Sequence, residues 1–339
     1  MKLIETEKAA GHVLCHDLTQ IIPGQFKGAR FRKGHVVTEE DIPVLLSMGK
    51  EHLYVWEMTP GMVHENDGAA RLCRLCINDH MERGDVREGK IELTAGCDGL
   101  FRVDSRRLTA VNSGDEVMIA TRKGGTAVKK GDKLAGMRVI PLVIREEKLR
   151  AAEAAAGETP LLELLPWKLK TAAIVTTGGE VKKGLIEDAF TPVVIRKLAE
   201  YGIETIARTL SGDGVDNVAA AIGRMRAVRP DILLCTGGMS VDPDDNTPGG
   251  IRKSGADIVA YGAPVLPGAM FLLGYYEDGT PVCGLPGCVM YAGATVFDLI
   301  LPRLAAGVRV TRQDLAAMGE GGLCLGCKPC HYPACPFGK

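Results

Sequence analysis

The sequence predicts an α/β protein with a three-layer α/β/α domain and a mostly parallel sheet over residues 170–308. Three observations predict it. Strand and helix patterns alternate from Thr171 onward, the strands are short apolar runs, and glycine-rich turns follow several of them. Apolar runs without alternation are typical of strands covered on both faces. Successive strand-helix units imply a parallel sheet with helices on both sides.

For the region before this domain, the sequence pattern predicts an α+β segment over residues 1–60. It predicts a helix plus a β-rich, barrel-like domain over 61–165. Thr38 to Gly49 has the pattern of a capped helix, and 62–80 has apolar residues at helical spacing. From Lys90 to Ile144, short apolar alternations separated by turns predict an all-β stretch. A helix over Arg145 to Ala156 then gives way to breakers, which marks the domain boundary.

The elements of the α/β domain follow in order. Strands are predicted over 171–177, 203–208, 232–235, 257–260, 270–276 and 281–284. Helices are predicted over 187–201, 217–228 and 289–305, with a further helix starting at Thr247 and Pro248. Glu277-Asp278-Gly279 predicts a hairpin turn. Ligands of such sheets bind beyond the carboxyl ends of the strands.

Composition excludes several classes of function. The 339 residues carry a net charge of −1, with 46% hydrophobic and 24% charged residues. This balance gives no support to a nucleic-acid or anionic-membrane binder. The opening residues lack the apolar core of a signal peptide, and no uncharged run is long enough to span a membrane. We therefore expect a cytoplasmic protein.

The segment Asp231 to Gly250, D-I-L-L-C-T-G-G-M-S-V-D-P-D-D-N-T-P-G-G, is the most informative. A strand, a glycine turn and a helix start create a place where backbone N–H groups can face an anion. The carboxylates of Asp242, Asp244 and Asp245 would repel bare phosphate, but they can hold Mg²⁺, which bridges acid and phosphate. The pattern indicates a phosphorylated, metal-dependent ligand.

Two further turns follow strands, and G-L-P-G at 284–287 precedes the last helix. One such turn with solvated acids would mean little, but together they favour a binding site. Neither a dinucleotide fingerprint nor a P-loop is present. The acids of these loops are Glu180, Asp188 and Asp213. Four nearby cations could contact phosphate: Lys182, Lys183, Arg252 and Lys253. Each of them taken alone is more typical of a solvated surface charge.

Several linked motifs resemble the molybdopterin-binding domain of the MoeA/MogA-like molybdenum cofactor biosynthesis proteins. They are T-T-G-G-E-V (176–181), I-E-D (186–188), C-T-G-G-M-S-V-D-P-D-D-N-T (235–247), L-P-G-A-M (266–270) and G-L-P-G (284–287). The resemblance covers about 170–308. G-H-V-L-C-H-D-L-T (11–19) also resembles the start of the longer, MoeA-type members.

The resemblance implies a molybdopterin site along these loops, with Mg²⁺. Positions matching the family's cofactor-binding turns are Gly178, Gly179, Glu180, Gly237, Gly238, Ser240, Pro267, Gly268, Pro286 and Gly287. Asp188 matches a family acid, and Asp245 matches the acid associated with Mg²⁺ and molybdate insertion. We expect Asp245, Asp242 and Asp188 to position metal and phosphate. In such enzymes an adenylylated pterin receives molybdate and AMP is released.

Three departures separate this sequence from the family pattern. Ala269 stands where the turn has lysine, Cys288 where it has asparagine, and Gly179 where it has an acid. The resemblance therefore indicates what is bound more firmly than what is done to it. The alternatives are a non-catalytic carrier or sensor of the cofactor, and hydrolysis of another nucleotide-linked compound on the same fold. The resemblance also implies a homodimer and, as partners, molybdoenzymes or other cofactor-biosynthesis proteins.

The tail 320–339 contains a second pattern. Cys324, Cys327, Cys330 and Cys335 have C-x₂-C-x₂-C-x₄-C spacing, with His331 beside them. Short gaps let neighbouring thiolates converge on one metal, so the tail predicts a zinc or iron–sulfur site. The alternative is a redox-sensitive tail without metal. Cys73 and Cys76 lie on a helical pattern, where packing is the favoured interpretation.

Overall fold

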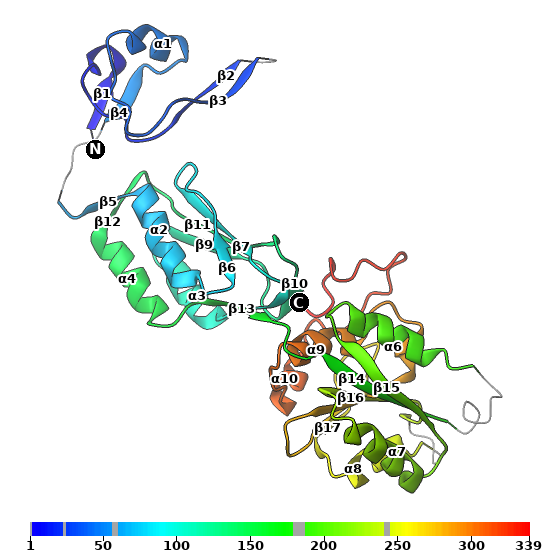
Figure 1. The fold of residues 1–339 in the computed structure, drawn as a ribbon. Coiled ribbons are helices and arrows are strands. Elements are labelled where there is room, and N and C mark those ends of the chain that lie inside the picture. The colour runs from blue at the N-terminus through cyan, green and yellow to red at the C-terminus, as the bar shows by residue number, and fades with distance from the viewer. Residues whose placement is uncertain (1, 23–24, 56–59, 179–186, 241–244) are drawn as a thin grey trace. The chain divides into compact units, whose positions relative to one another are not determined.

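The structure is a computed structural model that describes residues 2–22, 25–55, 60–178, 187–240 and 245–339 (Figure 1). The chain divides into two compact units, and the main boundary lies between Leu164 and Leu165. Short pieces around residues 98–100 and 125–127 group with the second unit. Within the described ranges, no helix has both the length and the apolar character needed to cross a bilayer.

The first part of the N-terminal unit contains two antiparallel strand pairs and one helix. Its elements are β1 (Lys2–Glu5), the 3₁₀ turn η1 (Thr6–Lys8), β2 (Leu18–Ile22), β3 (Phe26–Phe31), α1 (Asp41–Ser47) and β4 (His52–Val55). β1 pairs with β4, and β2 with β3. Helix α1 is the helix predicted over 38–49. A small core around Leu14, Leu45 and Leu53 holds these elements together.

The second part of this unit is a mixed α/β arrangement. Its elements are β5 (Met62–His64), α2 (Glu65–Cys76), β6 (Met81–Arg83), β7 (Lys90–Ala95), β8 (Gly99–Val103), α3 (Ser105–Asn112), β9 (Val117–Thr121), β10 (Thr126–Val128), β11 (Lys133–Val139), β12 (Val143–Arg145), α4 (Glu146–Ala156) and β13 (Leu162–Pro166). The sheets have the orders β6-β7-β11-β9, β12-β5 and β10-β8-β13. The guanidinium of Arg71 on α2 joins Glu146 and Glu153 of α4, with N···O distances of 2.7 Å.

The prediction of an all-β, barrel-like stretch over 90–144 was wrong. Helix α3 lies in the middle of it, and the four-stranded sheet has β6 and β9 as its outer strands. The physical reason is a local cap, because the carboxylate of Asp104 accepts a hydrogen bond from Arg107 N at 3.0 Å and starts the helix. Cys73 and Cys76 are buried in the core of this unit, and burial raises the pKa of Cys76 to about 12. Packing is therefore the correct interpretation of this pair.

The C-terminal unit is the predicted α/β domain. Its elements are β14 (Thr171–Thr177), α6 (Phe190–Ala199), β15 (Glu204–Ser211), α7 (Val215–Ala227), β16 (Ile232–Thr236), α8 (Thr247–Lys253), β17 (Asp257–Tyr261), β18 (Leu272–Tyr275), β19 (Pro281–Leu285), η2 (Gly287–Met290), α9 (Val296–Ala305) and α10 (Arg312–Ala317). They form one six-stranded sheet in the order β15-β14-β16-β19-β18-β17. The first four strands are parallel, and β18 is antiparallel to both neighbours.

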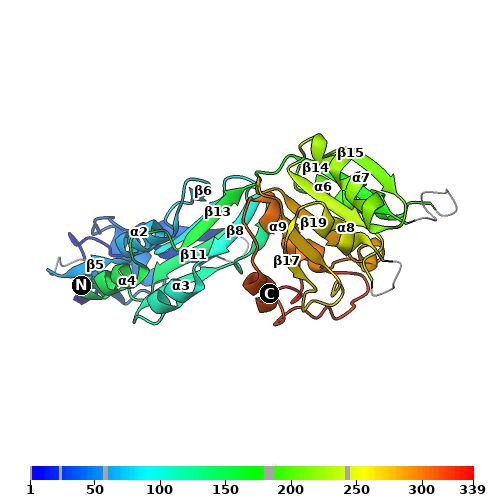
Figure 2. The same ribbon diagram turned by 90° about the horizontal axis from the view of Figure 1, so that it is seen from below.

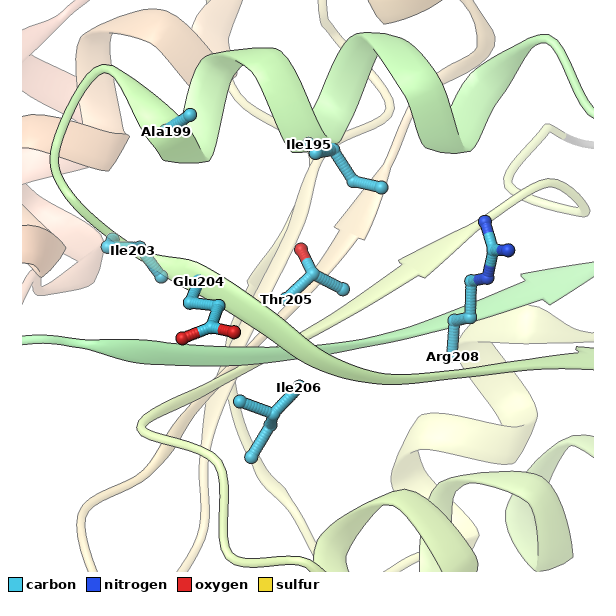
Figure 3. A pocket seen from close by; sticks show the side chains of 7 residues that line it. All are labelled: Ile195, Ala199, Ile203, Glu204, Thr205, Ile206 and Arg208. Atoms are coloured by element: carbon cyan, nitrogen blue, oxygen red, sulfur yellow. The ribbon is translucent and has the colours of Figure 1, made fainter.

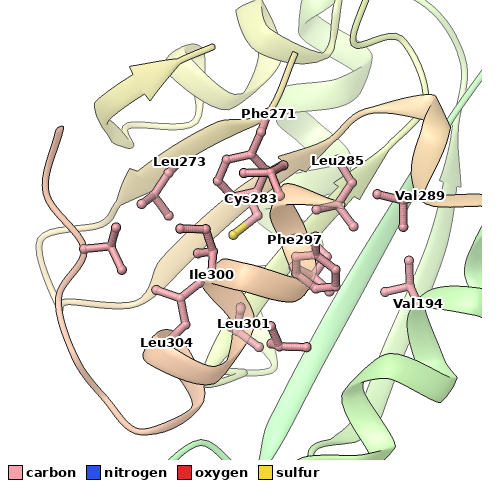
Figure 4. Close-up of a cluster of buried hydrophobic side chains, with 14 of the residues drawn as sticks. Val194, Phe271, Leu273, Cys283, Leu285, Val289, Phe297, Ile300, Leu301 and Leu304 are labelled. Atoms are coloured by element: carbon pink, nitrogen blue, oxygen red, sulfur yellow. The ribbon is translucent and has the colours of Figure 1, made fainter. Parts of the chain in front are cut away.

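Helices cover both faces of this sheet, which confirms the three-layer prediction (Figures 1 and 2). On one face, α6 and α9 bury side chains such as Val194, Phe297 and Ile300 against the sheet (Figure 4). On the other face, α7 and α8 bury Val218 and Ile251. Strand β14, buried from Ala172 to Thr177, lies between these two cores. Coverage of both faces explains why the central strands lack alternation.

Two helix starts differ from the prediction. The helix predicted over 289–305 is divided, because η2 ends at Met290 and α9 starts at Val296 behind a capping box of Thr295 and Asp298. Thr247 lies inside α8 rather than at its cap, where Asn246 stands. Its hydroxyl is instead used in a tertiary contact at the carboxyl ends of the strands.

The pairing of β14 with β15 is irregular. Ala172 pairs with Thr205, whereas the next residue, Ala173, pairs with Ala207. Ile206 is therefore an extra residue, which is the arrangement of a β-bulge. β15 lies at one end of the strand order, so this bulge is in an edge strand.

Candidate functional site

The carboxyl ends of β14, β15, β16 and β19 lie at one edge of the sheet because these strands are parallel. The turns that follow them carry most of the predicted ligand-binding residues. β14 and β16 both end in a threonine followed by a glycine pair, in the sequences T-G-G at 177–179 and 236–238. The structure therefore brings these turns, which are far apart in the sequence, to one edge of the sheet.

Buried threonine hydroxyls connect these turns. Thr177 Oγ1 donates to the carbonyl of Thr236 at 3.1 Å and lies 2.9 Å from Thr247 Oγ1. One residue earlier, Thr176 Oγ1 lies 2.9 Å from Thr191 Oγ1 and accepts from Thr236 Oγ1 at 3.3 Å. All five hydroxyl-bearing side chains are buried. Buried, satisfied polar groups of this kind fix the relative positions of the elements that carry them.

The glycine pair after β16 lies directly against this network. Gly237 has a φ of 81°, and a Cβ on it would lie 2.3 Å from the carbonyl oxygen of Thr177. Gly238 has a φ of 52°, and its Cβ would lie 2.9 Å from Thr247 Oγ1. Only glycine permits both the backbone conformation and the close approach. The start of α8 is held against this glycine pair by the hydrogen bond from Thr247 N to the Gly238 carbonyl at 3.2 Å.

Asp245 is the described acid of this loop. Its Oδ2 accepts a hydrogen bond from Ser240 N at 2.7 Å, so the two predicted residues are in direct contact. The hydroxyl of Tyr261, on β17, donates to the carbonyl of Met239 at 3.0 Å. Burial, together with the negative charge of Asp245, raises the pKa of Tyr261. Tyr261 therefore remains a neutral donor that supports the loop at neutral pH.

Asp188 is engaged within the protein. Its Oδ1 accepts from the backbone N–H groups of Phe190 and Thr191, each at 3.0 Å, and its Oδ2 accepts from Thr191 Oγ1 at 2.5 Å. Burial opposes ionisation, but these hydrogen bonds and a further one from Thr176 outweigh it and lower the pKa of Asp188. The carboxylate thus fastens the start of α6 to the end of β14, and it is ionised at neutral pH.

The two proline-glycine turns lie near the start of the last long helix. Gly268 has a φ of 128°, and a Cβ on it would lie 2.5 Å from Val296 Cγ1. Val296 N donates to the carbonyl of Pro267 at 3.2 Å, which seats this turn on α9. In the second turn, Pro286 is buried and Gly287 is exposed with open space where a side chain would be. Gly287 can therefore be approached closely by a ligand.

Some predicted residues fall outside the part of the chain that the structure describes. They are Gly179, Glu180, Lys182, Lys183, Asp242 and Asp244. The described residues contain no group of three or more His, Cys, Asp or Glu side chains arranged to hold a metal ion. Asp245, as one carboxylate, could hold Mg²⁺ only together with oxygens of a ligand, which is the usual manner of Mg²⁺ binding at phosphate sites.

A cavity of about 500 Å³ lies elsewhere in this unit, between α6 and the amino-terminal half of β15 (Figure 3). Its lining is mainly apolar, with Ile195, Ala199 and Ile203 among the residues, and Glu204 and Arg208 carry its charges. Thr205 Oγ1 is buried there without a hydrogen-bond partner. The cavity lies away from the glycine turns, which follow the other ends of the strands. The glycine turns offer close backbone approach and a carboxylate, which suit a phosphorylated, metal-bound ligand, whereas the cavity is lined mainly by apolar side chains.

Sequence reasoning missed the threonines and Tyr261. The signal for the threonines was present, because each glycine pair is preceded by a threonine and Thr247 precedes the proline of α8. Their mutual contacts depend on strand pairing that a single sequence does not reveal. No local pattern distinguished Tyr261 from other strand tyrosines.

Two segments of the chain match known sequence families. Residues 173–306 match a family described as "Probable molybdopterin binding domain", and residues 3–57 match a domain family of unknown function. The first match spans the sheet, the glycine turns and α9. The C-terminal unit is therefore a domain of the molybdopterin-binding, molybdenum cofactor biosynthesis type.

Curated relatives share a short segment with this chain. A CinA-like protein from Desulfosudis oleivorans is 37% identical over 83 residues, which are 24% of this chain and 20% of the relative. Protein TK1472 from Thermococcus kodakarensis is 32% identical over 76 residues, 22% of this chain and 30% of the relative. The chain thus spans less than a third of the length of these relatives.

Solved structures with lower identity are also similar. MoaB from Thermus thermophilus has 22% identity and a TM-score of 0.35, covering 40% of this chain and 92% of that one. The molybdopterin biosynthesis MoeA protein from Pyrococcus horikosii has 16% identity and a TM-score of 0.34, covering 90% of this chain and 74% of that one.

Proposed function

We propose that the C-terminal unit binds molybdopterin, or its adenylylated form, along the carboxyl ends of β14, β15, β16 and β19. The observation that carries the proposal is the pair of T-G-G turns, which buried threonine hydroxyls join at that edge. They lie within the segment that matches the molybdopterin-binding family. A turn that is held before the ligand arrives loses little conformational entropy on binding.

The site residues have different parts in this proposal. The turns at Gly178, Gly237 and Gly287 would bring backbone groups close to the phosphate and pterin. Asp245, oriented by Ser240 N, would hold Mg²⁺ together with phosphate oxygens of the ligand. Bound Mg²⁺ would neutralise phosphate charge and favour departure of a phosphate group. Asp188 would act indirectly, because its oxygens hold the start of α6.

The finer proposal is assistance of molybdate insertion. The phosphoanhydride bond of the adenylylated pterin would be hydrolysed, with water supplying the new oxygen and AMP leaving. The two dithiolene sulfurs would bind molybdenum while one oxygen of molybdate leaves as water with the two thiol protons, without a change of oxidation state. Tungstate has the same charge and shape and would be an alternative substrate. Asp245 and Mg²⁺ would be required for this step but not for pterin binding alone.

The second candidate is a carrier that holds the cofactor without insertion. Ala269 favours it, because its exposed position presents a methyl group where the resembling family has a lysine. The backbone of this turn is nevertheless intact, since Ala263 N donates to the carbonyl of Ala269 at 2.9 Å. The turn thus keeps its shape while lacking the cation.

The test uses the full chain, purified without oxygen, with adenylylated molybdopterin, Mg²⁺ and molybdate. Bound pterin is measured by fluorescence after oxidation, and released AMP by chromatography. The variants are Thr177→Val for the turn and Asp245→Ala for the metal. Asp257→Ala is the matched control, because Asp257 is an exposed acid at the opposite, amino-terminal edge of the sheet.

Each outcome decides between the candidates. Release of AMP that Asp245→Ala abolishes, with pterin binding retained, supports the insertion function. Tight binding without AMP release supports the carrier. If the wild-type chain binds no pterin, or Thr177→Val binds it as well as the control does, the site proposal is wrong.

A further inference from the structure

The C-terminal tail is fastened to the C-terminal unit on both sides of its cysteines. At the start, Leu323 forms a parallel bridge with Leu266, and Cys324 N donates to the carbonyl of Leu266 at 2.8 Å. At the end, Phe337 is 3% exposed and lies in the core. Between them, the Tyr332 hydroxyl donates to the carbonyl of Asp298 at 3.0 Å. These contacts fasten the segment that carries the four thiols to the C-terminal unit at both ends and at Tyr332.

The thiols differ in exposure. Cys324 and Cys335 are partly buried and pack against the core, whereas Cys327 and Cys330 are exposed. Gly326, with a φ of 67°, turns the backbone between the first two cysteines. Cys324 and Cys335 are thus held by the core, whereas the segment between them carries the exposed Cys327 and Cys330. This arrangement can close around an ion when the exposed segment moves.

Cys330 has a defined seat on the domain. A Cβ on Gly293 would lie 2.8 Å from Cys330 Sγ, so the cysteine side chain lies directly over this glycine. Gly293 belongs to the loop between η2 and α9, which follows the Pro286-Gly287 turn. The cysteine run therefore starts beside the Leu266-Pro267 turn and passes over the loop behind the second proline-glycine turn.

The thiols are not gathered around a common point in the conformation described here, since no group of three metal-ligating side chains occurs among the described residues. Gathering them requires movement within the tail. Leu325 is 75% exposed and Cys327 is also exposed, so the part of the tail around these two residues can move while Cys324 and Tyr332 keep their contacts with the domain. Metal sites commonly obtain their geometry only when the ion binds.

We propose that Cys324, Cys327, Cys330 and Cys335 bind one thiophilic metal centre, which closes the tail on the C-terminal unit. Four thiolates complete the tetrahedral set that zinc prefers, and the same donors hold iron–sulfur clusters. Binding of Zn²⁺ converts four thiols to thiolates and releases their protons to solvent, leaving a doubly negative centre. Lys328, between the second and third ligands, supplies a compensating charge close by. The site is independent of the proposed pterin function.

The test separates the two metal centres by what is added to the metal-free full chain without oxygen. One arm titrates Zn²⁺ against a chromogenic chelator and counts bound zinc and protected thiols. The other adds a mixture of ferrous and ferric iron with sulfide, so that no oxidant is needed, and records visible absorbance and iron content. We expect one centre per chain in one of these arms, with four thiols protected from alkylation.

Variants assign the ligands. Cys330→Ser should weaken metal binding by about 100-fold, because one of four ligands is lost. The double variant Cys327→Ser with Cys330→Ser should abolish it. Cys97→Ser is the matched control, because Cys97 is a partly exposed thiol of the N-terminal unit. The proposal is wrong if neither arm loads the wild-type chain, or if the double variant binds metal like the control. None of these measurements involves pterin, so the two proposals fail separately.

Discussion

Replacing Gly237 with alanine should destabilise the glycine turn after β16. The loss of stability should exceed the cost of placing a side chain at a positive φ. A residue with a side chain at positive φ costs about 1–2 kcal/mol. In addition, the new Cβ would lie 2.3 Å from the Thr177 carbonyl oxygen, which belongs to the end of a buried strand and has little freedom to move. Overpacking of this kind typically costs about 1–3 kcal/mol.

The matched control is Gly279→Ala. Gly279 has almost the same φ, 84°, but a Cβ on it meets nothing within 4 Å. The difference between the two variants therefore isolates the contact with Thr177. We expect Gly237→Ala to be less stable than Gly279→Ala by about 2 kcal/mol, which is roughly 4–8 °C in Tm for a domain of this size.

Scanning calorimetry of the full chain measures this difference, because the transition of the C-terminal unit can be compared directly between the variants. Pterin affinity is measured on the same samples, and it should fall for Gly237→Ala and stay unchanged for Gly279→Ala. Equal Tm values for the two variants would refute the close approach of Gly237 to Thr177. Unchanged pterin affinity in a destabilised Gly237→Ala would instead refute a part for this turn in binding.

Three further predictions concern stability. Asp188→Ala should cost about 1–2 kcal/mol, because the N–H groups of Phe190 and Thr191 at the start of α6 lose their carboxylate acceptor. Since the folded-state pKa of Asp188 is lowered, its stabilisation is complete above the unfolded pKa of about 3.9 and is lost as the pH falls through the folded value. Urea unfolding at pH 7 and at low pH should therefore show the two proteins converging in acid. Arg71→Ala should lower the Tm of the N-terminal unit by breaking its contacts with Glu146 and Glu153, and calorimetry in high salt should show a smaller difference. Gly223→Ala should raise stability by about 0.5–1 kcal/mol in urea unfolding, because this exposed glycine lies within α7 and a Cβ there meets nothing.

The order of strands and helices in the α/β domain could be predicted from the sequence, because hydrophobic periodicity and glycines at turns are local signals. These signals located every strand of the six-stranded sheet and the turns at its carboxyl edge. Helix starts were less predictable, as Thr247 shows. Its place before Pro248 resembles a cap, yet its hydroxyl bonds to Thr177, on a strand distant in sequence. Such a choice is decided by tertiary contacts.

The errors in the N-terminal unit have a local origin. Helix α3 lies among β patterns, and its cap at Asp104 was a readable signal that the surrounding alternation obscured. The divided last helix likewise had a readable start, since Thr295 and Asp298 have capping-box spacing. For the site, residue type and spacing indicated the loops but not the hydroxyl contacts between them. Gly179, Glu180 and Asp242 remain predictions.

The extra residue in β15 bears on the colloidal behaviour of the protein. An edge strand of eight residues with Ile206 and Leu210 exposed at 43% and 44% could act as a template for pairing with another copy. The bulge at Ile206 interrupts the regular spacing that such pairing requires. Arg208, between the two apolar residues, adds a charge that would repel the same position of a second strand in several registers. We therefore expect this local irregularity to reduce edge-to-edge pairing of folded chains at high concentration.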